Sequence, residues 1–298
     1  MQEVLKGRWE SLGDLPDIPF LIDSVTRRAL RLDATRSVLL TYGPDYQEST
    51  DRSFSKAWRR IFLVDPERAE FFENLRLAGA LWTYGETDTQ DRVQFFAEYL
   101  WHADTALHNA ALIEIGRAPY KLVRPIGDTS TTRQILRDFN DLNRFPYRSV
   151  AIRLLGLQTD PQARSIVKAR FADVLASGDL HSYEWALAGI EADEEAAINA
   201  IGLALQDRQR TSVDRQPLIR ALAEAGESQA RFKPQIIQIF SEALGMDSDL
   251  ALQIAIATRQ WGSTQLNQQF EALLARADTD PATQFALNLA LGTGVATD

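Results

Sequence analysis

The sequence predicts an all-α protein in which pairs of helices stack into a right-handed α-α superhelix. Two observations support this fold class. Helical segments rich in Ala, Leu and Ile recur along the chain, and each is closed by a glycine or a polar turn. Within these segments the apolar residues, such as Val150, Leu154 and Leu157, have helical spacing, whereas the alternation at period two that is typical of strands is scarce.

The ends of these segments recur at similar intervals. They fall at Gly85, Gly116, Gly156, a polar turn near Asp193, Gly226, Gly262 and Gly292. The steps between them are 31, 40, 37, 33, 36 and 30 residues, within the window of roughly 20 to 50 residues in which self-similarity indicates a repeat architecture. Glycine at such an end can adopt the left-handed conformation that closes a helix.

Asp-Pro pairs predict where helices begin. They occur at residues 65–66, 160–161 and 280–281. The aspartate offers a capping oxygen, and proline at the first helical position loses no hydrogen bond because that N–H has no intrahelical partner. The stretch RSVAIRLLGLQTDPQAR, residues 148–164, is therefore expected to hold the second helix of one unit, a turn and the first helix of the next.

The period and the small-residue pattern over about residues 66–292 resemble those of HEAT-like repeats, which are antiparallel helix pairs stacked into a solenoid. The resemblance implies about six repeats over residues 66–298. Residues 1–65 are expected to form an N-terminal extension and helical cap, with amphipathic helices at 20–32 and 54–64. The long step before Gly156 predicts an added helix at about 130–139 and a loop through Pro146.

Composition excludes several classes of function. The 298 residues carry 41 Asp and Glu against 32 Lys and Arg, and nonspecific nucleic-acid binding needs cationic contacts, so no nucleic-acid partner is expected. The chain has no cysteine, which excludes disulfides, thiolate catalysis and Cys-ligated metals. No apolar run approaches the roughly 20 residues of a transmembrane helix. The absence of cysteine and an opening that resembles the end of a strand favour a periplasmic or secreted location, with the leader absent from this chain.

No metal site is expected, although one arrangement stays open. His102 and His108 are six residues apart, which on one helix places them about 240° from each other, so they could not share a metal. They could converge, with Asp104 or Glu98 as a partner, if a loop intervenes between Trp101 and Thr105.

Two acidic stretches are interpreted as helix starts. In GETDTQDR, residues 85–92, Thr87 or Asp88 is expected to cap a helix with Asp91 in its first turn, and an EF-hand pattern is lacking. EADEE, residues 191–195, is expected to be a solvated helix N-terminus. No nucleophile elbow, zinc-protease pair, P-loop or dinucleotide fingerprint occurs. The chain is therefore expected to be non-catalytic and to hold no cofactor.

In a stack of this kind the second helices line a concave surface, and polar residues there are candidates for binding a partner. These candidates are Glu114, Arg148, Arg153, Glu184, Arg220, Glu224 and Arg259. Their mixed charge suits a protein or peptide partner better than a polyanion, so a scaffold or adaptor is the preferred hypothesis.

The alternative is a small-molecule function on the same scaffold. HEAT-like repeats resemble those of phycobilin lyases, which handle a tetrapyrrole, although no motif here matches one residue by residue. They also resemble those of a class of DNA glycosylases, which suits this acidic chain badly.

Overall fold

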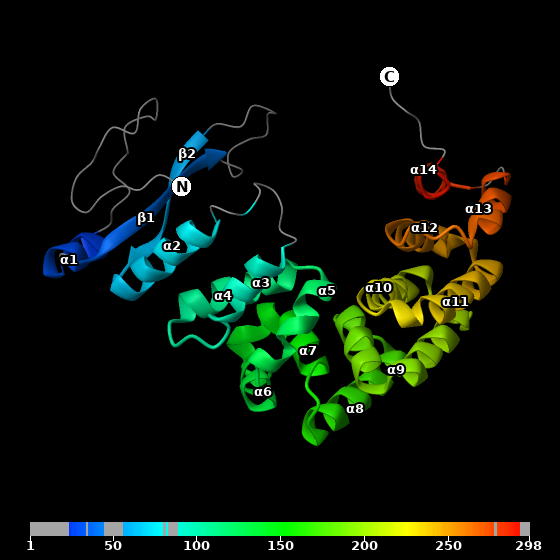
Figure 1. Cartoon of the computed structure of the whole chain (residues 1–298), viewed down its shortest axis with the longest axis horizontal. Coiled ribbons are helices and arrows are strands. Elements are labelled where there is room, and N and C mark those ends of the chain that lie inside the picture. The colour runs from blue at the N-terminus through cyan, green and yellow to red at the C-terminus, as the bar shows by residue number, and fades with distance from the viewer. Residues whose placement is uncertain are drawn as a thin grey trace. The chain divides into compact units, whose positions relative to one another are not determined.

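The computed structural model describes residues 24–33, 35–44, 56–79, 82, 89–276 and 279–292. The chain divides into two compact units, residues 1–86 and 87–298, and each is described by itself. The division falls after Glu86, whereas the sequence placed the end of the N-terminal cap at residue 65. Most of the described residues are helical (Figure 1), which confirms the all-α class.

The described part of unit 1 contains two helices and a hairpin. The elements are α1 (Ser24–Leu32), β1 (Ser37–Pro44), β2 (Lys56–Val64) and α2 (Pro66–Gly79). The strands pair antiparallel, with Ser37 opposite Val64 and Pro44 opposite Lys56. The structure therefore confirms a helix within 20–32 over residues 24–32, while residues 20–23 lie outside the described part of the chain.

The helix predicted at 54–64 is wrong, because residues 56–64 form strand β2. The stretch ends in Ile, Phe, Leu and Val, of which Ile, Phe and Val are enriched in strands. Its pairing partner, β1, is separated from it in the sequence by residues 45–55. Periodicity within the stretch alone could not reveal that pairing.

The described elements of unit 2 are all helices (Figure 1). They are α3 (Gln90–Ala97), α4 (Thr105–Arg117), α5 (Tyr120–Val123), η1 (Arg124–Thr129), α6 (Thr132–Asn140), η2 (Leu142–Tyr147), α7 (Arg148–Gly156), α8 (Pro161–Ser177), α9 (Ser182–Gln206), α10 (Ser212–Ser228), η3 (Ala230–Phe232), α11 (Lys233–Met246), η4 (Ser248–Leu250), α12 (Ala251–Gln260), α13 (Asn267–Leu274) and α14 (Pro281–Ala290). No helix within these described ranges combines the length and the apolar character needed to cross a membrane.

The predicted helix ends are confirmed wherever the structure describes them. Helix α7 ends at Gly156, and α12 and α14 are followed by Gly262 (φ 65°) and Gly292 (φ 73°) in the left-handed region. The turn predicted near Asp193 is a kink inside α9, where Glu194 has φ 47° and ψ −121°. Helices α4 and α10 end within two residues of Gly116 and Gly226. Gly85 lies outside the described residues.

The Asp-Pro starts are also confirmed. Asp160 accepts hydrogen bonds from the backbone N–H groups of Gln162 and Ala163, both at 3.1 Å. Asp280 caps α14 in the same way. Asp65 accepts from the N–H of Arg68 at 2.9 Å. These carboxylates satisfy N–H groups that the first helical turn leaves without partners.

Three local predictions need correction or completion. The added helix is α6, which begins at Thr132, but the expected loop through Pro146 is the 3₁₀ helix η2. Helix α3 is capped by Thr89, which accepts from the N–H of Arg92, and Asp91 lies in its first turn as expected. The caps proposed at residues 87 and 88 lie outside the described residues.

The helices of unit 2 form a continuous row, which we call row A: α4, α7, α9, α10, α12 and α14, each packed on the next. Helices α6, α8, α11 and α13 each pack on helices of row A. Close packing needs small residues. A Cβ added to Gly156 of α7 would lie 2.6 Å from the Cα of Ala188 in α9, so these two backbones are nearly in contact.

Candidate functional site

A short segment of the chain crosses row A. Residues 118–129, which include α5 and η1 and which we call the strap, follow α4 directly, yet α5 packs on α10. Tyr120 of the strap is 1% exposed and belongs to the same hydrophobic core as residues of α9 and α10. The strap therefore covers part of the surface that the sequence assigned to a partner.

Ion pairs and hydrogen bonds fix the strap to α10. The backbone N–H of Tyr120 donates to Glu224 Oε2 at 3.1 Å. Lys121 Nζ lies 2.7 Å from Glu227 Oε1. Both carboxylates lie on α10, about a hundred residues along the chain from the strap. Glu224, a predicted partner-binding residue, is therefore engaged within the molecule.

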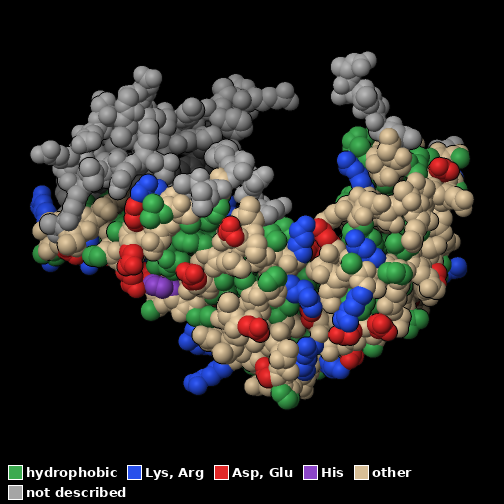
Figure 2. Space-filling view, in the orientation of Figure 1, with side chains coloured by type: hydrophobic (Ala, Val, Ile, Leu, Met, Phe, Trp, Pro, Cys, Tyr) green, Lys and Arg blue, Asp and Glu red, His purple; other side chains and the backbone are tan. Residues whose placement is uncertain are grey.

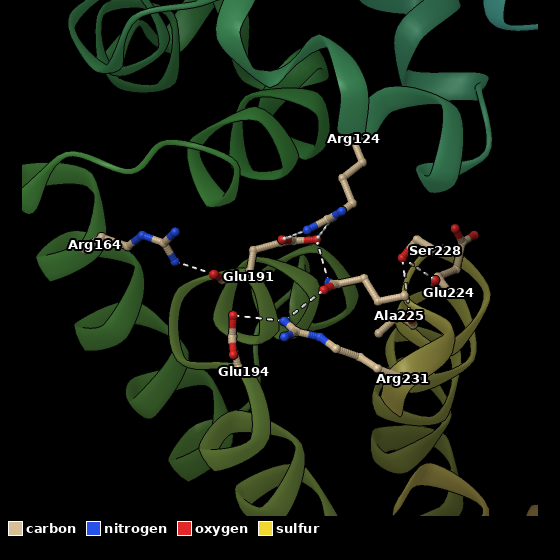
Figure 3. Close-up of polar contacts among 9 residues, drawn as sticks. Arg124, Arg164, Glu191, Glu194, Glu224, Ala225, Ser228 and Arg231 are labelled. Atoms are coloured by element: carbon tan, nitrogen blue, oxygen red, sulfur yellow. Dashed lines mark hydrogen bonds and ion pairs between the residues drawn. The ribbon is translucent and has the colours of Figure 1, made fainter. Parts of the chain in front are cut away.

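A second set of contacts fixes the strap to α9. Figure 3 shows Arg124 reaching the carboxylate of Glu191, and its Nε lies 2.8 Å from Oε1. The side-chain amide of Gln229 donates to the same oxygen at 3.1 Å, and Glu194 pairs with Arg231 at 2.9 Å. The side chain of Glu191 is only 9% exposed. The expectation of a fully solvated EADEE turn is therefore wrong for Glu191.

Arg153 is buried and binds the backbone where α4 meets the strap. It is 6% exposed, and its guanidinium donates to the backbone carbonyls of Gly116 at 3.0 Å and Ala118 at 2.9 Å. It also lies over the ring of Tyr120, 5.4 Å from the centroid. Burial, and then the charge of Glu191, raises the pKa of Tyr120 well above its usual value. Arg153 thus holds the start of the strap and is not exposed on a partner-binding face, contrary to its assignment from the sequence.

Other predicted binding residues also have partners inside unit 2. Glu114 forms an ion pair with Arg92. Glu184 lies 3.8 Å from His181 Nδ1. The guanidinium of Arg220 lies 4.1 Å from the centroid of the Tyr183 ring. Burial, followed by the charge of Glu224, raises the pKa of Tyr183.

The last two predicted residues line open cavities that lie on different elements. Arg148 borders a cavity of about 240 Å³ near the start of α7. Arg259 borders a groove of about 540 Å³ between α12 and α14. Arg148 and Arg259 therefore border two separate cavities. On the face of unit 2 drawn in Figure 2, basic and acidic side chains lie intermixed, without a continuous field of one sign.

The groove between α12 and α14 is largely apolar. Its walls include Leu252 and Ile256 from α12 and Phe285 and Leu289 from α14. Ile256 is 52% exposed and Phe285 is 66% exposed. Arg259 and Gln260 border it. Two large apolar side chains are thus presented to solvent side by side with one arginine.

The histidines do not form a metal site. His108 is buried, and its Nε2 lies 2.7 Å from Asp138 Oδ2, which also accepts from Arg144 at 3.2 Å. His102 Nδ1 instead accepts from the backbone N–H of Asp104 at 3.1 Å. Burial, followed by the charge of Arg144, lowers the pKa of His108. Within the described part of the chain, no group of three His, Asp or Glu side chains could hold a metal ion.

Sequence reasoning missed the strap. The available signal was the 40-residue step between Gly116 and Gly156. That step predicted the added helix α6 but not the preceding segment 118–129, whose contacts lie on helices far along the chain.

Comparison with known proteins adds little. No family model and no curated protein matches the chain. Among solved structures, human deoxyhypusine hydroxylase in complex with glycerol is similar over 77% of this chain and 80% of its own, at 18% identity and a TM-score of 0.28. A similarity this low carries no argument about fold or function.

Proposed function

We propose that this protein is a non-catalytic adaptor that binds an apolar segment of a partner protein in the groove between α12 and α14. The scaffold in this proposal is a HEAT-like α-solenoid. Its pairs are α3/α4, α6/α7, α8 with residues 182–193, residues 195–206 with α10, α11/α12 and α13/α14. The proposal of a solenoid is supported by the sequential packing of row A and by helix ends that recur at the predicted positions.

The observation that carries the proposed function is the exposed apolar groove. Leu252 and Ile256 are four residues apart on α12, and Phe285 and Leu289 are four apart on α14, so each pair lies on one helix face. Contiguous apolar surface bordered by polar residues is typical of interaction sites. An amphipathic helix commonly binds in such a groove through apolar side chains at helical spacing.

The polar border suggests the chemistry of the partner. Arg259 is exposed, and its side chain makes no hydrogen bond or ion pair with the residues that the structure describes. A guanidinium favours a carboxylate held in its plane. A partner helix with an apolar face and an acidic residue beside that face would satisfy both features of the groove.

The middle of row A is less suitable for a partner. The strap already covers it, and Glu191, Glu224 and Glu227 are paired with Arg124, Tyr120 and Lys121. A partner there would have to displace these contacts and expose the buried ring of Tyr120. The α12/α14 groove needs no such rearrangement.

The test compares a variant with charge in the groove and a variant with charge elsewhere on unit 2. Ile256→Asp combined with Phe285→Asp places charge in the groove, and Leu203→Asp places it on α9, where Leu203 is 69% exposed and lines neither cavity described above. Because all three side chains are largely exposed, we expect little change in unfolding temperature. Affinity capture from the native host should recover a partner with the wild type and with Leu203→Asp, and lose it with the double variant. A partner retained by the double variant would contradict the proposal.

The groove also offers a place for the small-molecule alternative. Its volume of about 540 Å³ lies within the roughly 300 to 1,000 Å³ of ligand pockets, and Arg259 could meet a carboxylate of a tetrapyrrole. Offering bilin or haem to the wild type should then give a visible absorption band that Arg259→Gln weakens. The absence of a band would contradict this alternative.

A further inference from the structure

The smaller cavity, of about 240 Å³, lies where α6 ends, α7 begins, α8 ends and α9 begins. Phe139, Phe145 and Trp185 supply aromatic walls, and Phe139 meets Trp185 edge to face with ring centroids 5.9 Å apart. Arg148 and Arg170 supply two cations. The cavity therefore combines flat apolar walls with positive charge.

Arg148 is an arginine without a carboxylate partner. Its guanidinium lies 5.3 Å from the ring centroid of Phe139 and 4.9 Å from that of Phe145. Its Nε is buried and has no hydrogen-bond acceptor, and no ion pair joins Arg148 to any residue that the structure describes. Buried polar groups usually have a partner, and because Arg148 lines the cavity, an acceptor bound in the cavity would supply one.

His181, whose ring centroid lies 6.2 Å from that of Phe145, repeats this feature. Its Nε2 is buried and has no partner among the described residues. The two carboxylates that line the cavity within the part of the chain that the structure describes, Asp173 and Asp179, do not pair with Arg148. Asp179 accepts from the backbone N–H of His181 at 2.7 Å. Arg148 thus lines the cavity without an anion from the described part of the chain, whereas His181 has Glu184 3.8 Å from its Nδ1 and only its Nε2 lacks a partner.

We infer that this cavity binds a small organic carboxylate with a flat apolar body, held by Arg148 and enclosed by the aromatic walls. A carboxylate matches the planar fork of arginine. The size of the cavity, below the roughly 300 Å³ of pockets for drug-sized ligands, suits a single ring. A doubly charged phosphate fits less well, because Asp173 and Asp179 would repel it. This site is separate from the α12/α14 groove, and the inference stands whether or not the proposed adaptor function holds.

The experiment titrates the full chain with benzoate by calorimetry and compares benzyl alcohol and inorganic phosphate. Benzoate should bind, and benzyl alcohol, which has the same ring without the charge, should bind at least about tenfold more weakly. Arg148→Gln should reduce benzoate affinity by a similar factor. Arg133→Gln, an exposed arginine on α6 that lines neither cavity described above, should leave it unchanged.

Several results would overturn the inference. These are no benzoate binding to the folded wild type at millimolar concentration, equal binding of benzyl alcohol, stronger binding of phosphate, or equal losses in Arg148→Gln and Arg133→Gln. The comparison of ligands on the wild type stands even if Arg148→Gln fails to fold. An acetylated tripeptide ending in phenylalanine separates the two sources of a carboxylate. Tighter binding of the peptide than of benzoate would assign the site to a partner's C-terminus and overturn the inference of a small free acid.

Discussion

The contact between α7 and α9 can be tested with one methyl group. In Gly156→Ala the new Cβ would lie 2.6 Å from the Cα and 2.7 Å from the Cβ of Ala188, whereas carbon atoms pack at about 3.5 to 4.0 Å. The two helices must therefore separate by about 1 Å, because the clash involves backbone that cannot rotate away. Overpacking of this kind typically costs about 1 to 3 kcal/mol.

Gly245→Ala is the matched control. Gly245 lies in α11, and a Cβ there would meet nothing within 4 Å. Replacing glycine by alanine at a compatible position stabilises a protein by about 0.4 to 1 kcal/mol through the unfolded chain. Both variants gain this term, so the difference between them reports the α7/α9 contact. We expect Gly156→Ala to be less stable than Gly245→Ala by about 1 to 3 kcal/mol.

Urea unfolding followed by helical ellipticity measures this difference. The slope of the transition should be the same for both variants, since neither changes the surface exposed on unfolding. Heating gives a second reading, because 1 kcal/mol corresponds to about 2 to 4 °C in a unit of 150 to 250 residues. Equal stability of the two variants would refute the close approach of α7 and α9.

Three further predictions concern the polar groups of unit 2. Arg153→Met should lower the free energy of unfolding in urea by about 1 to 3 kcal/mol, because it leaves the buried carbonyl of Ala118 and the half-buried carbonyl of Gly116 without this donor; wild-type stability would contradict the structural role of Arg153. The pKa of His108 is lowered in the folded state, so on acidification below about pH 6.5 the unfolded chain takes up a proton before the folded chain does. The free energy of unfolding should therefore decrease as the pH is lowered, by at most about 1.4 kcal/mol per pH unit, until the folded pKa is reached. His108→Gln should flatten that part of a pH series of urea unfolding, and an unchanged slope would exclude His108 as its source. Asp160→Ala should lower the urea midpoint through loss of the α8 cap, while Asp160→Asn should largely keep the wild-type midpoint. Equal midpoints for Asp160→Ala and the wild type would show that the cap contributes nothing.

Local signals in the sequence predicted several helix boundaries of unit 2. Asp-Pro pairs mark the starts at Asp160 and Asp280, and glycines mark the ends at Gly156, Gly262 and Gly292. These features depend on a few neighbouring residues, since a cap is a contact within one helical turn. Sequence patterns therefore suffice for them.

Long-range contacts explain the errors. Strand β2 depends on its pairing with β1, and the burial of Tyr120 depends on α9 and α10. Arg148 and Arg153 are five residues apart on one helix, yet Arg148 lies between two phenylalanine rings and Arg153 binds backbone carbonyls. Replacing both arginines by glutamate would therefore damage the fold, because Arg153 binds backbone carbonyls, as well as any binding face that Arg148 belongs to. The periodicity of α7 could not distinguish these two surroundings.

The adaptor proposal is tested most directly by photocrosslinking from the groove in the native host. A benzophenone amino acid replaces Phe285 in one variant and Leu203 in the other; both native side chains are exposed and apolar. We predict a discrete crosslinked protein from position 285 that is absent from position 203. No crosslink from position 285, or the same products from both positions, would contradict a partner-binding groove between α12 and α14.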